Sequence, residues 1–208
     1  MEKLTKIYGF NTAGALYLSC FYEIYDIIYI LTTNISWHDM NGNIKVFDLQ
    51  GYKIKEIPNS NDRAIFIDTY YDSNFDKNFI VTCNRKGRIN IYDFKNNALF
   101  KKYDDNDNNY KFLINGFVVD EREPIKKLIK SCYEALIKIW DFYKGNLIKR
   151  IMFNYDGVYN LYGLCIFNNN YLLAGTNEIN DNNNYNARAI ILLIDLNKGK
   201  SIKKIKAN

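Results

Sequence analysis

The sequence predicts an all-β fold made of four similar four-stranded sheets, and three observations support this prediction. Short segments that alternate apolar and polar residues recur along all 208 residues, with polar turns between them. Tyrosine (18) and phenylalanine (13) are abundant and only two prolines occur, which favours strands. An aspartate ends a strand-like run four times, at intervals of 45, 48 and 54 residues. These aspartates are Asp48, Asp93, Asp141 and Asp195.

The interval between the aspartates is close to the ~40 to 45 residues of a four-stranded propeller blade. A single small sheet exposes two apolar faces, so neighbouring units must stack to bury them. We therefore expect one domain over residues 1–208. Its blades are predicted at approximately 11–58, 62–104, 110–153 and 157–207. In the second blade the predicted strands are 64–70, 78–83, 88–94 and 98–103.

A polar corner follows each aspartate. Four residues beyond three of the aspartates stand Asn97, Gly145 and Gly199, and Gly51 follows Asp48 one residue sooner. Glycine and asparagine tolerate the positive φ that turns a strand back on itself. An aspartate carboxylate can accept hydrogen bonds from the backbone N–H groups of such a turn. We therefore expect the four aspartates to be structural turn residues.

Two segments resemble the signature of tryptophan-aspartate (WD) repeat propellers. "IVTCNRKGRINIYD" (80–93) has its small residues, its glycine turn and its aromatic-Asp ending, and "ALIKIWD" (135–141) matches the last half closely. The resemblance implies a β-propeller whose faces dock other proteins. The repeats are degenerate. The histidine of the family's buried network is absent from every unit, and Lys86 and Glu134 stand where its aspartate would fall.

The resemblance also implies where partners dock and how many blades are needed. Family members usually have about seven blades, so four predict a partial propeller that takes further blades from a longer chain, a partner or a second copy. Residues 1–10 are a candidate for one further strand. The docking face of the family collects the turns between second and third strands. The candidate partner-binding residues are therefore Trp37, His38, Arg85, Lys86, Tyr133 and Glu134.

The function that these observations favour is a non-catalytic scaffold that docks a peptide or a subunit of a multiprotein complex. One alternative is a nucleic-acid-associated subunit, because the net charge is +5. However, 28 basic and 23 acidic residues make a mixed surface, and the C-terminal lysines alternate with Ile202 and Ile205 as on the exposed face of a strand. Further alternatives are a small propeller enzyme that uses His38 and a fragment of a larger WD-repeat protein.

No catalytic, cofactor or metal site is predicted. Four cysteines without a Cys-x-x-Cys pair, and a single histidine, argue against zinc. The acidic run 104–109 lacks the glycine and the terminal glutamate of a helix-loop-helix calcium site, so a polar link is favoured. The segment 177–189 is predicted to be a surface insertion.

The sequence also predicts the location of the protein. Each cysteine lies in an apolar run, which favours buried free thiols in a reducing compartment. The apolar N-terminal region is interrupted by Asn11, Glu23 and Asp26, and no unbroken stretch approaches the ~20 residues of a membrane span. We expect no membrane partner and an intracellular location, cytoplasmic or nuclear.

Overall fold

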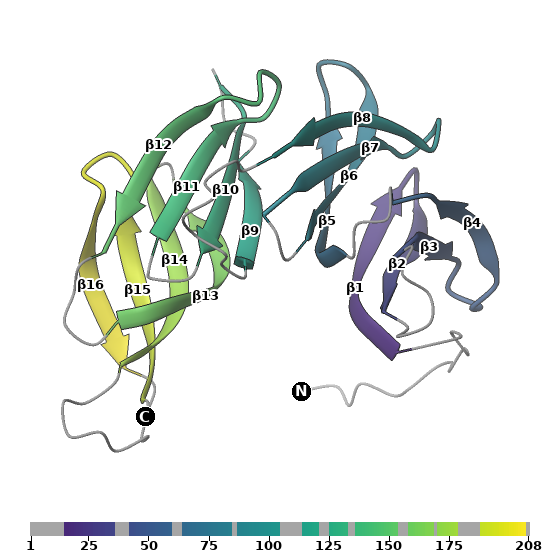
Figure 1. Cartoon of the computed structure of the whole chain (residues 1–208). Helices are drawn as coiled ribbons and strands as arrows, with labels where there is room; N and C mark the ends of the chain where they lie inside the picture. Colours follow the sequence, from purple (N-terminus) through teal and green to yellow (C-terminus); the bar gives the residue numbers. More distant parts are fainter. Residues whose placement is uncertain are drawn as a thin grey trace. The chain divides into compact units, whose positions relative to one another are not determined.

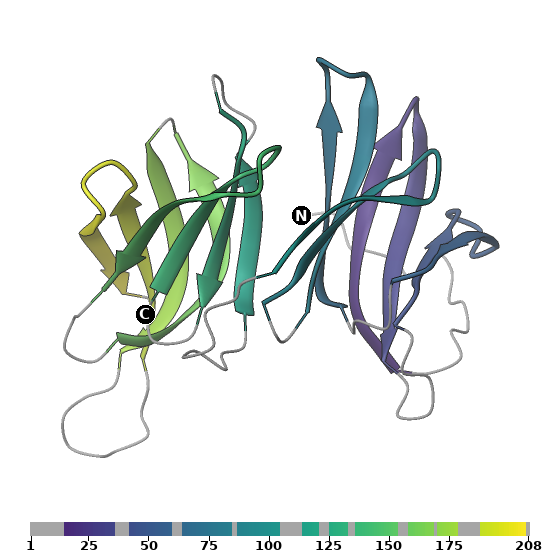
Figure 2. The ribbon, with the colours of Figure 1, turned by 45° about the horizontal axis from the view of Figure 1, so that its top comes forward.

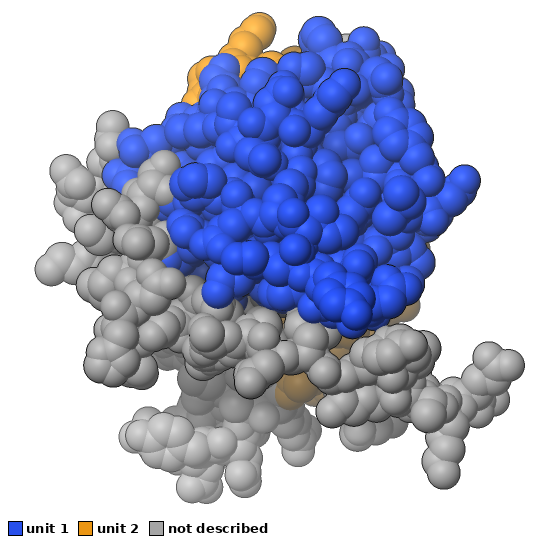
Figure 3. All heavy atoms as spheres, turned by 90° about the vertical axis from the view of Figure 1, so that its right-hand side faces the viewer, with its two compact units in different colours: residues 1–105 blue, residues 106–208 orange. Residues whose placement is uncertain are grey.

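The four sheets predicted from the sequence are present. The computed structural model describes residues 15–35, 42–59, 64–84, 87–104, 114–120, 125–132, 136–153, 158–168, 170–178 and 188–206. Over these residues, sixteen strands form four antiparallel sheets of four strands each (Figure 1), which confirms the predicted fold class. The chain divides into two compact units, residues 1–105 and 106–208 (Figure 3). The proposed extra strand at residues 1–10 lies outside the described residues.

The first unit contains two sheets in which each strand pairs with the next along the chain. One sheet consists of β1 (Ala15–Ile24), β2 (Ile27–Ile35), β3 (Ile44–Phe47) and β4 (Lys53–Ile57). The other consists of β5 (Ala64–Asp72), β6 (Lys77–Asn84), β7 (Ile89–Asp93) and β8 (Ala98–Tyr103). The two sheets lie face to face in Figures 1 and 2.

The second unit repeats this arrangement. One sheet consists of β9 (Ile114–Asp120), β10 (Lys127–Cys132), β11 (Leu136–Asp141) and β12 (Leu147–Met152). The other consists of β13 (Val158–Phe167), β14 (Tyr171–Glu178), β15 (Arg188–Asp195) and β16 (Lys200–Lys206). Of the two polar segments discussed above, residues 105–109 and 179–187 lie outside the described part of the chain.

The corner after each third strand has the backbone that the sequence predicts. Positive φ angles occur at Gly51 (87°), Asn97 (54°), Gly145 (75°) and Gly199 (65°). The N–H of Gly145 donates to the backbone carbonyl of Asp141 over 2.9 Å, and Gly199 donates to that of Asp195 over 2.8 Å. These residue types therefore stand where the chain reverses direction between third and fourth strands.

The aspartate carboxylates hold these turns by accepting hydrogen bonds from backbone N–H groups of the turn. Asp141 accepts hydrogen bonds from the N–H groups of Tyr143 and Lys144 at 2.9 and 2.8 Å. Asp93 and Asp195 each accept equivalent bonds from the residues two and three places further on, at 2.9 to 3.0 Å. Asp48 differs, because its carboxylate accepts from the N–H of Tyr52 at 2.8 Å in a turn that is one residue shorter. Each aspartate thus satisfies N–H groups that the turn leaves without a strand partner.

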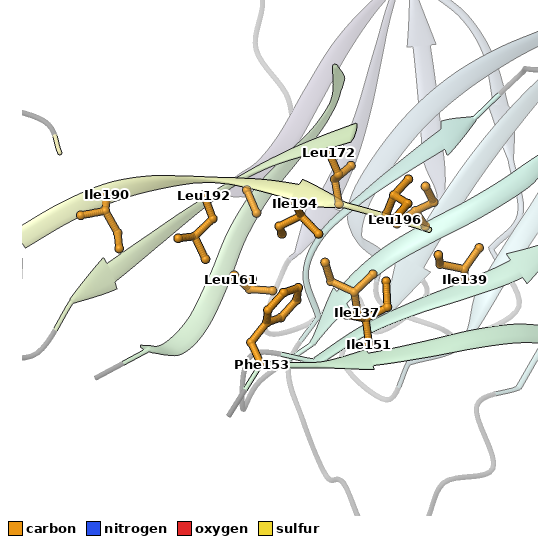
Figure 4. Close-up of a cluster of buried hydrophobic side chains, with 12 residues drawn as sticks. Ile137, Ile139, Ile151, Phe153, Leu161, Leu172, Ile190, Leu192, Ile194 and Leu196 are labelled. Carbon is orange, nitrogen blue, oxygen red and sulfur yellow. The ribbon is translucent and has the colours of Figure 1, made fainter. Parts of the chain in front are cut away.

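A core that is aliphatic apart from Phe153 joins the two sheets of the second unit. Side chains from β10, β11 and β12 face side chains from β13, β14 and β15 (Figure 4). The cluster consists of Ile129, Ile137, Ile139, Ile151, Phe153, Leu161, Leu172, Ala174, Ile190, Leu192, Ile194 and Leu196. The close approach of the backbones at Gly116 in β9 and Gly163 in β13 leaves little room for a side chain at Gly116, whose added Cβ would lie 3.1 Å from the Gly163 Cα.

The core of the first unit is partly aromatic. Its members from the first sheet are aliphatic, whereas the second sheet contributes Tyr92 and Phe94. The cluster consists of Ile24, Leu31, Ile44, Val46, Ile57, Ile67, Ile80, Tyr92 and Phe94. Tyr92 occupies the position before the turn aspartate, where Trp140 and Ile194 stand in the sheets of the second unit.

Asn59 sits at the centre of a buried polar network in the first unit. Its side-chain oxygen accepts hydrogen bonds from the Tyr92 hydroxyl at 2.6 Å and from the Asn90 side-chain amide at 3.2 Å. Its own amide donates to the Gly42 carbonyl at 3.2 Å, and its backbone N–H donates to the Asn43 side-chain oxygen at 3.3 Å. Because Asn59 follows β4 while Tyr92 and Asn90 lie in β7, the network joins the two sheets.

The cysteines do not all meet the expectation of burial. Cys83 is buried and Cys20 partly buried, and burial raises the pKa of the Cys20 thiol to about 12, with a smaller contribution from Asp68. The expectation is wrong for Cys165, which is exposed. Its neighbours Leu164 and Ile166 pack against the core of the second unit, so Cys165 points to the opposite face of the sheet. An intracellular location remains a prediction.

Candidate functional site

The six residues predicted to bind partners lie outside the described residues. Trp37 and His38 fall between β2 and β3 in the sequence, Arg85 and Lys86 between β6 and β7, and Tyr133 and Glu134 between β10 and β11. Their role therefore stays a prediction. The described residues instead form a candidate site at the other ends of the strands.

A pocket of about 590 Å³ lies between the two sheets of the first unit. Four segments line it: the hairpin that joins β1 to β2, strand β4, the turn from β5 into β6, and the end of β7 with the turn after Asp93. The lining residues are Ile24, Tyr25, Tyr29, Lys55, Phe75, Asp76, Lys77, Asn78, Asp93, Phe94, Lys95 and Asn96. The pocket therefore combines aromatic rings with groups of both charges.

Phe94 forms the aromatic centre of the pocket. The ring of Tyr29 lies 5.4 Å from it in a tilted arrangement, and that of Tyr22 lies 6.0 Å away, edge to face. The Lys55 ammonium lies 3.5 Å from the centre of the Phe94 ring and donates a hydrogen bond to the Phe94 carbonyl. Burial lowers the pKa of Lys55, and the negative charge of Asp93 opposes this shift in part.

Asp93 links the pocket to the repeated turn. One carboxylate oxygen accepts the two backbone bonds of the turn, and the other lies 3.3 Å from the Lys77 ammonium. Burial alone would raise the pKa of Asp93. The hydrogen bonds from the Asn96 backbone and from Lys77 outweigh that effect and hold the pKa below its ordinary value. Asp93 is therefore a carboxylate at neutral pH.

Two exposed aromatic side chains form the rim of the pocket. Tyr25 is 77% exposed and Phe75 is 60% exposed. Tyr25 and Asp26 are the two central residues of the hairpin and both have positive φ, 49° and 62°, as a type I′ turn requires. A bulky side chain is uncommon in this backbone conformation, which asparagine and glycine favour. The position of the Tyr25 ring is thus not explained by the needs of the turn.

The pocket of the first unit contains aromatic rings and charged groups that are paired within the protein. The described part of the chain contains no group of three or more His, Cys, Asp or Glu side chains that could hold a metal ion. The ammonium groups of Lys55 and Lys77 are each engaged within the pocket, as described above. Among the described residues, no helix has the length and hydropathy needed to cross a membrane.

Comparisons with known proteins show the fold. No protein-family model matches the chain, and no curated protein sequence matches it. The chain is similar to the crystal structure of the WD40 β-propeller domain of Doa1, with a TM-score of 0.59 and 14% sequence identity. The match covers 80% of this chain and 49% of that one, so the chain spans about half the length of the matched domain. The fold of the chain is therefore similar to part of a WD40 β-propeller.

Proposed function

We propose that the chain is a non-catalytic protein-interaction module that docks a peptide or a subunit of a multiprotein complex. The observation that carries this proposal is the pair of exposed aromatic rings, Tyr25 and Phe75, at the rim of the pocket in the first unit. Exposed aromatic side chains beside a cavity are typical anchors of protein interfaces. The WD40 propeller fold supports the proposal by analogy only.

The charges of the pocket favour a particular kind of peptide. Asp93 is paired with Lys77, and Lys55 already donates to the Phe94 carbonyl. Because these groups are satisfied within the protein, a strongly acidic or basic side chain would have to displace them. We therefore propose that the ligand inserts an apolar or aromatic side chain between the rim rings, and that its backbone makes the polar contacts.

The turns between second and third strands are a second proposed docking surface. They carry the predicted residues Trp37, His38, Arg85, Lys86, Tyr133 and Glu134. The support for this surface is the resemblance of the repeats to WD-repeat propellers. The two surfaces are distinguishable because they involve different residues of the chain.

A peptide selection tests both surfaces. Phage-displayed random peptides would be selected on the full chain, and the affinity of the recovered peptides measured by fluorescence anisotropy. The pocket variant is Tyr25→Asn with Phe75→Ala, in which asparagine suits the positive φ of the hairpin. The matched control is Tyr52→Ala. Tyr52 lies in another turn of the sheet that contains Tyr25 and is 73% exposed. The variant of the second surface is Arg85→Glu with Lys86→Glu.

The pocket proposal expects a clear pattern. The Tyr25/Phe75 variant should lose at least about 10-fold in affinity, since an aromatic anchor contributes about 2 kcal/mol or more. The Tyr52 control should change little, and the melting temperature of each variant should stay close to that of the original chain. Loss of binding only in the Arg85/Lys86 variant would assign the ligand to the strand turns instead. Failure to recover any specific peptide would count against an interaction module.

The nucleic-acid alternative is not favoured by the arrangement of the C-terminal lysines. In β16 the isoleucines Ile202 and Ile205 are exposed as well as the lysines between and beside them. The strand was expected to expose one charged face, but it presents a mixed apolar and basic surface. A continuous basic stripe of the kind that follows a phosphate backbone is not formed there.

A further inference from the structure

The last sheet, β13–β16, exposes positions that are buried in the equivalent sheets of the chain. Two and four residues before the turn aspartate, the first sheet has Val46 and Ile44, and the third sheet has Ile139 and Ile137. All four are buried against the following sheet of their unit. The equivalent residues of the last sheet are Leu193, which is partly buried, and Ile191, which is 43% exposed.

The edge strand shows the same difference. Ile57 pairs with Ile44 in the first sheet, and Ile151 pairs with Ile137 in the third; both partners on the edge strand are buried. Ile205 pairs with Ile191 in the last sheet and is 43% exposed. Cys165, which pairs with Leu173, is exposed on this face too. This face of the last sheet is thus apolar and open at the positions that the first and third sheets use for stacking.

A lysine of the fourth strand joins stacked sheets in both units. Lys55 lies opposite Val46, and its ammonium donates to the Phe94 carbonyl in the turn of the following sheet. Lys149 lies opposite Ile139, and its ammonium donates to the carbonyls of Leu196 and Asn197, each at 2.8 Å. In both units the acceptors are the first residues after a turn aspartate. The contact is therefore a repeated link between consecutive sheets.

Lys203 occupies the equivalent position in the last sheet. It lies opposite Leu193 in the pairing of β15 with β16 and is exposed. Within the described part of the chain, its ammonium has no hydrogen-bond or ion-pair partner. Lys203 is thus placed to donate to the turn carbonyls of a further sheet of the same kind.

The first sheet, β1–β4, has a complementary face that is open at its margins, whereas Phe47 at its centre is buried. Leu49 follows Asp48 as Phe94 follows Asp93 and Leu196 follows Asp195. Leu49 is 41% exposed. Phe94 and Leu196 are each only 9% exposed, and each lies beside the lysine of the preceding sheet in its unit, Lys55 or Lys149. Phe21 and Ile28 are also exposed, and the pairing of Phe21 with Ile30 and of Ile30 with Phe47 places them on the same face as Phe47.

We propose that the open face of β13–β16 binds the exposed margin of the β1–β4 face, formed by Leu49, Phe21 and Ile28, in a second copy of this chain, with Lys203 donating to the backbone carbonyls of Leu49 or Gln50. Two features support a second copy as the occupant. Both halves of the contact are present in one sequence, and the chain spans 49% of the matched propeller domain, so a second copy supplies a similar number of blades. Such a contact joins different surfaces of the two copies head to tail.

The test is the oligomeric state of the full chain and of variants with one altered face. Ile205→Asp alters the face of the last sheet, and Leu49→Asp alters that of the first. Lys203→Glu is compared with Lys204→Glu, because the two lysines are adjacent and receive the same charge change. Lys204 pairs with Leu192, whose side chain belongs to the core, so it lies on the opposite face. Circular dichroism would verify that each variant keeps its strands.

The proposal expects the mass of the original chain, measured by light scattering, to rise with concentration from one chain to two or more. Ile205→Asp and Leu49→Asp should each remain monomeric, and an equal mixture should form a heterodimer because one intact pair of faces remains. Lys203→Glu should weaken assembly by at least about 10-fold, whereas Lys204→Glu should not. Alkylation of the Cys165 thiol should slow as the original chain assembles.

Three results would overturn the proposal. The first is an original chain that stays monomeric at every concentration while Cys165 reacts at an unprotected rate, as would be found if a different protein or a further segment of a longer chain covers the face. The second is an equal effect of Lys203→Glu and Lys204→Glu. The third is a mixture of the Ile205 and Leu49 variants that remains monomeric.

Discussion

Replacement of Asn59 by alanine is the most direct perturbation of the contact between the first two sheets. Asn59 is almost fully buried, and its side chain makes three hydrogen bonds to groups on two different sheets. Alanine removes the acceptor of the Tyr92 hydroxyl and the Asn90 amide, and also the donor to the Gly42 carbonyl. The bond from the backbone N–H of residue 59 to Asn43 can remain.

The expected cost follows from the groups left without partners. A buried donor or acceptor that loses its partner costs about 1 to 3 kcal/mol. Three such groups set the upper limit of the cost in unfolding free energy, and water that enters the space of the removed amide lowers this cost. We expect Asn59→Ala to reduce the free energy of unfolding by about 2 to 4 kcal/mol. Tyr92→Phe should cost about 1 kcal/mol, because only one of these bonds is removed.

Urea unfolding followed by circular dichroism measures these changes, and hydrogen exchange of the β7 amides localises them to the first unit. The loss of unfolding free energy in the double variant Asn59→Ala/Tyr92→Phe should be about 1 kcal/mol smaller than the sum of the losses in the two single variants. This difference is the coupling energy of a direct hydrogen bond. Asn197→Ala, at an exposed turn position, is the control and should stay within about 0.5 kcal/mol. An Asn59→Ala variant as stable as the control would refute the reasoning.

Two further predictions concern the turn and the packing of the sheets. Asp93→Asn should lower stability by about 1 kcal/mol at neutral pH, because the carboxylate holds two backbone N–H groups and Lys77. The pKa of Asp93 is lower in the folded chain than its ordinary value, so its contribution is present above about pH 4 and is lost as the pH falls through the folded pKa. Urea unfolding at a series of pH values should therefore show that the difference in unfolding free energy between the original chain and the Asp93→Asn variant becomes smaller in acid. Gly116→Ala should lower stability by about 1 to 3 kcal/mol, since its Cβ would lie 3.1 Å from the Gly163 backbone; an unchanged urea midpoint would contradict this.

The sequence predicted the fold because the information for it is local and repeated. Each aspartate marks the end of a third strand, and each residue with a tolerance for positive φ stands where the chain turns. The strands predicted for the second sheet agree with β5 to β8 to within two residues at every end. Alternation, turn chemistry and spacing all act over a few residues, so one sequence is enough to recognise them.

The pocket and the polar network were not predicted, because they depend on residues far apart in the chain. Asn59 looks like an ordinary loop residue after a proline, and only the stacking of two sheets brings it to Tyr92. Tyr25 and Asp26 form a hairpin turn without glycine or asparagine, so the turn had no signal inside an apolar run. The exposure of Cys165 was missed for a related reason, since alternation does not show which face of a sheet is covered.

The two units show why degenerate repeats can stack in the same way. Their inter-sheet cores differ, since one contains Tyr92 and Phe94 where the other contains Ile194 and Leu196. What they share is the turn aspartate, which fixes the backbone of the next few residues by accepting their N–H groups. Because the turn is fixed, its carbonyls are presented at a constant position to the lysine of the preceding sheet. The aspartate and the lysine therefore act together, and a local turn becomes a link between sheets that requires neither the tryptophan nor the histidine of the WD repeat.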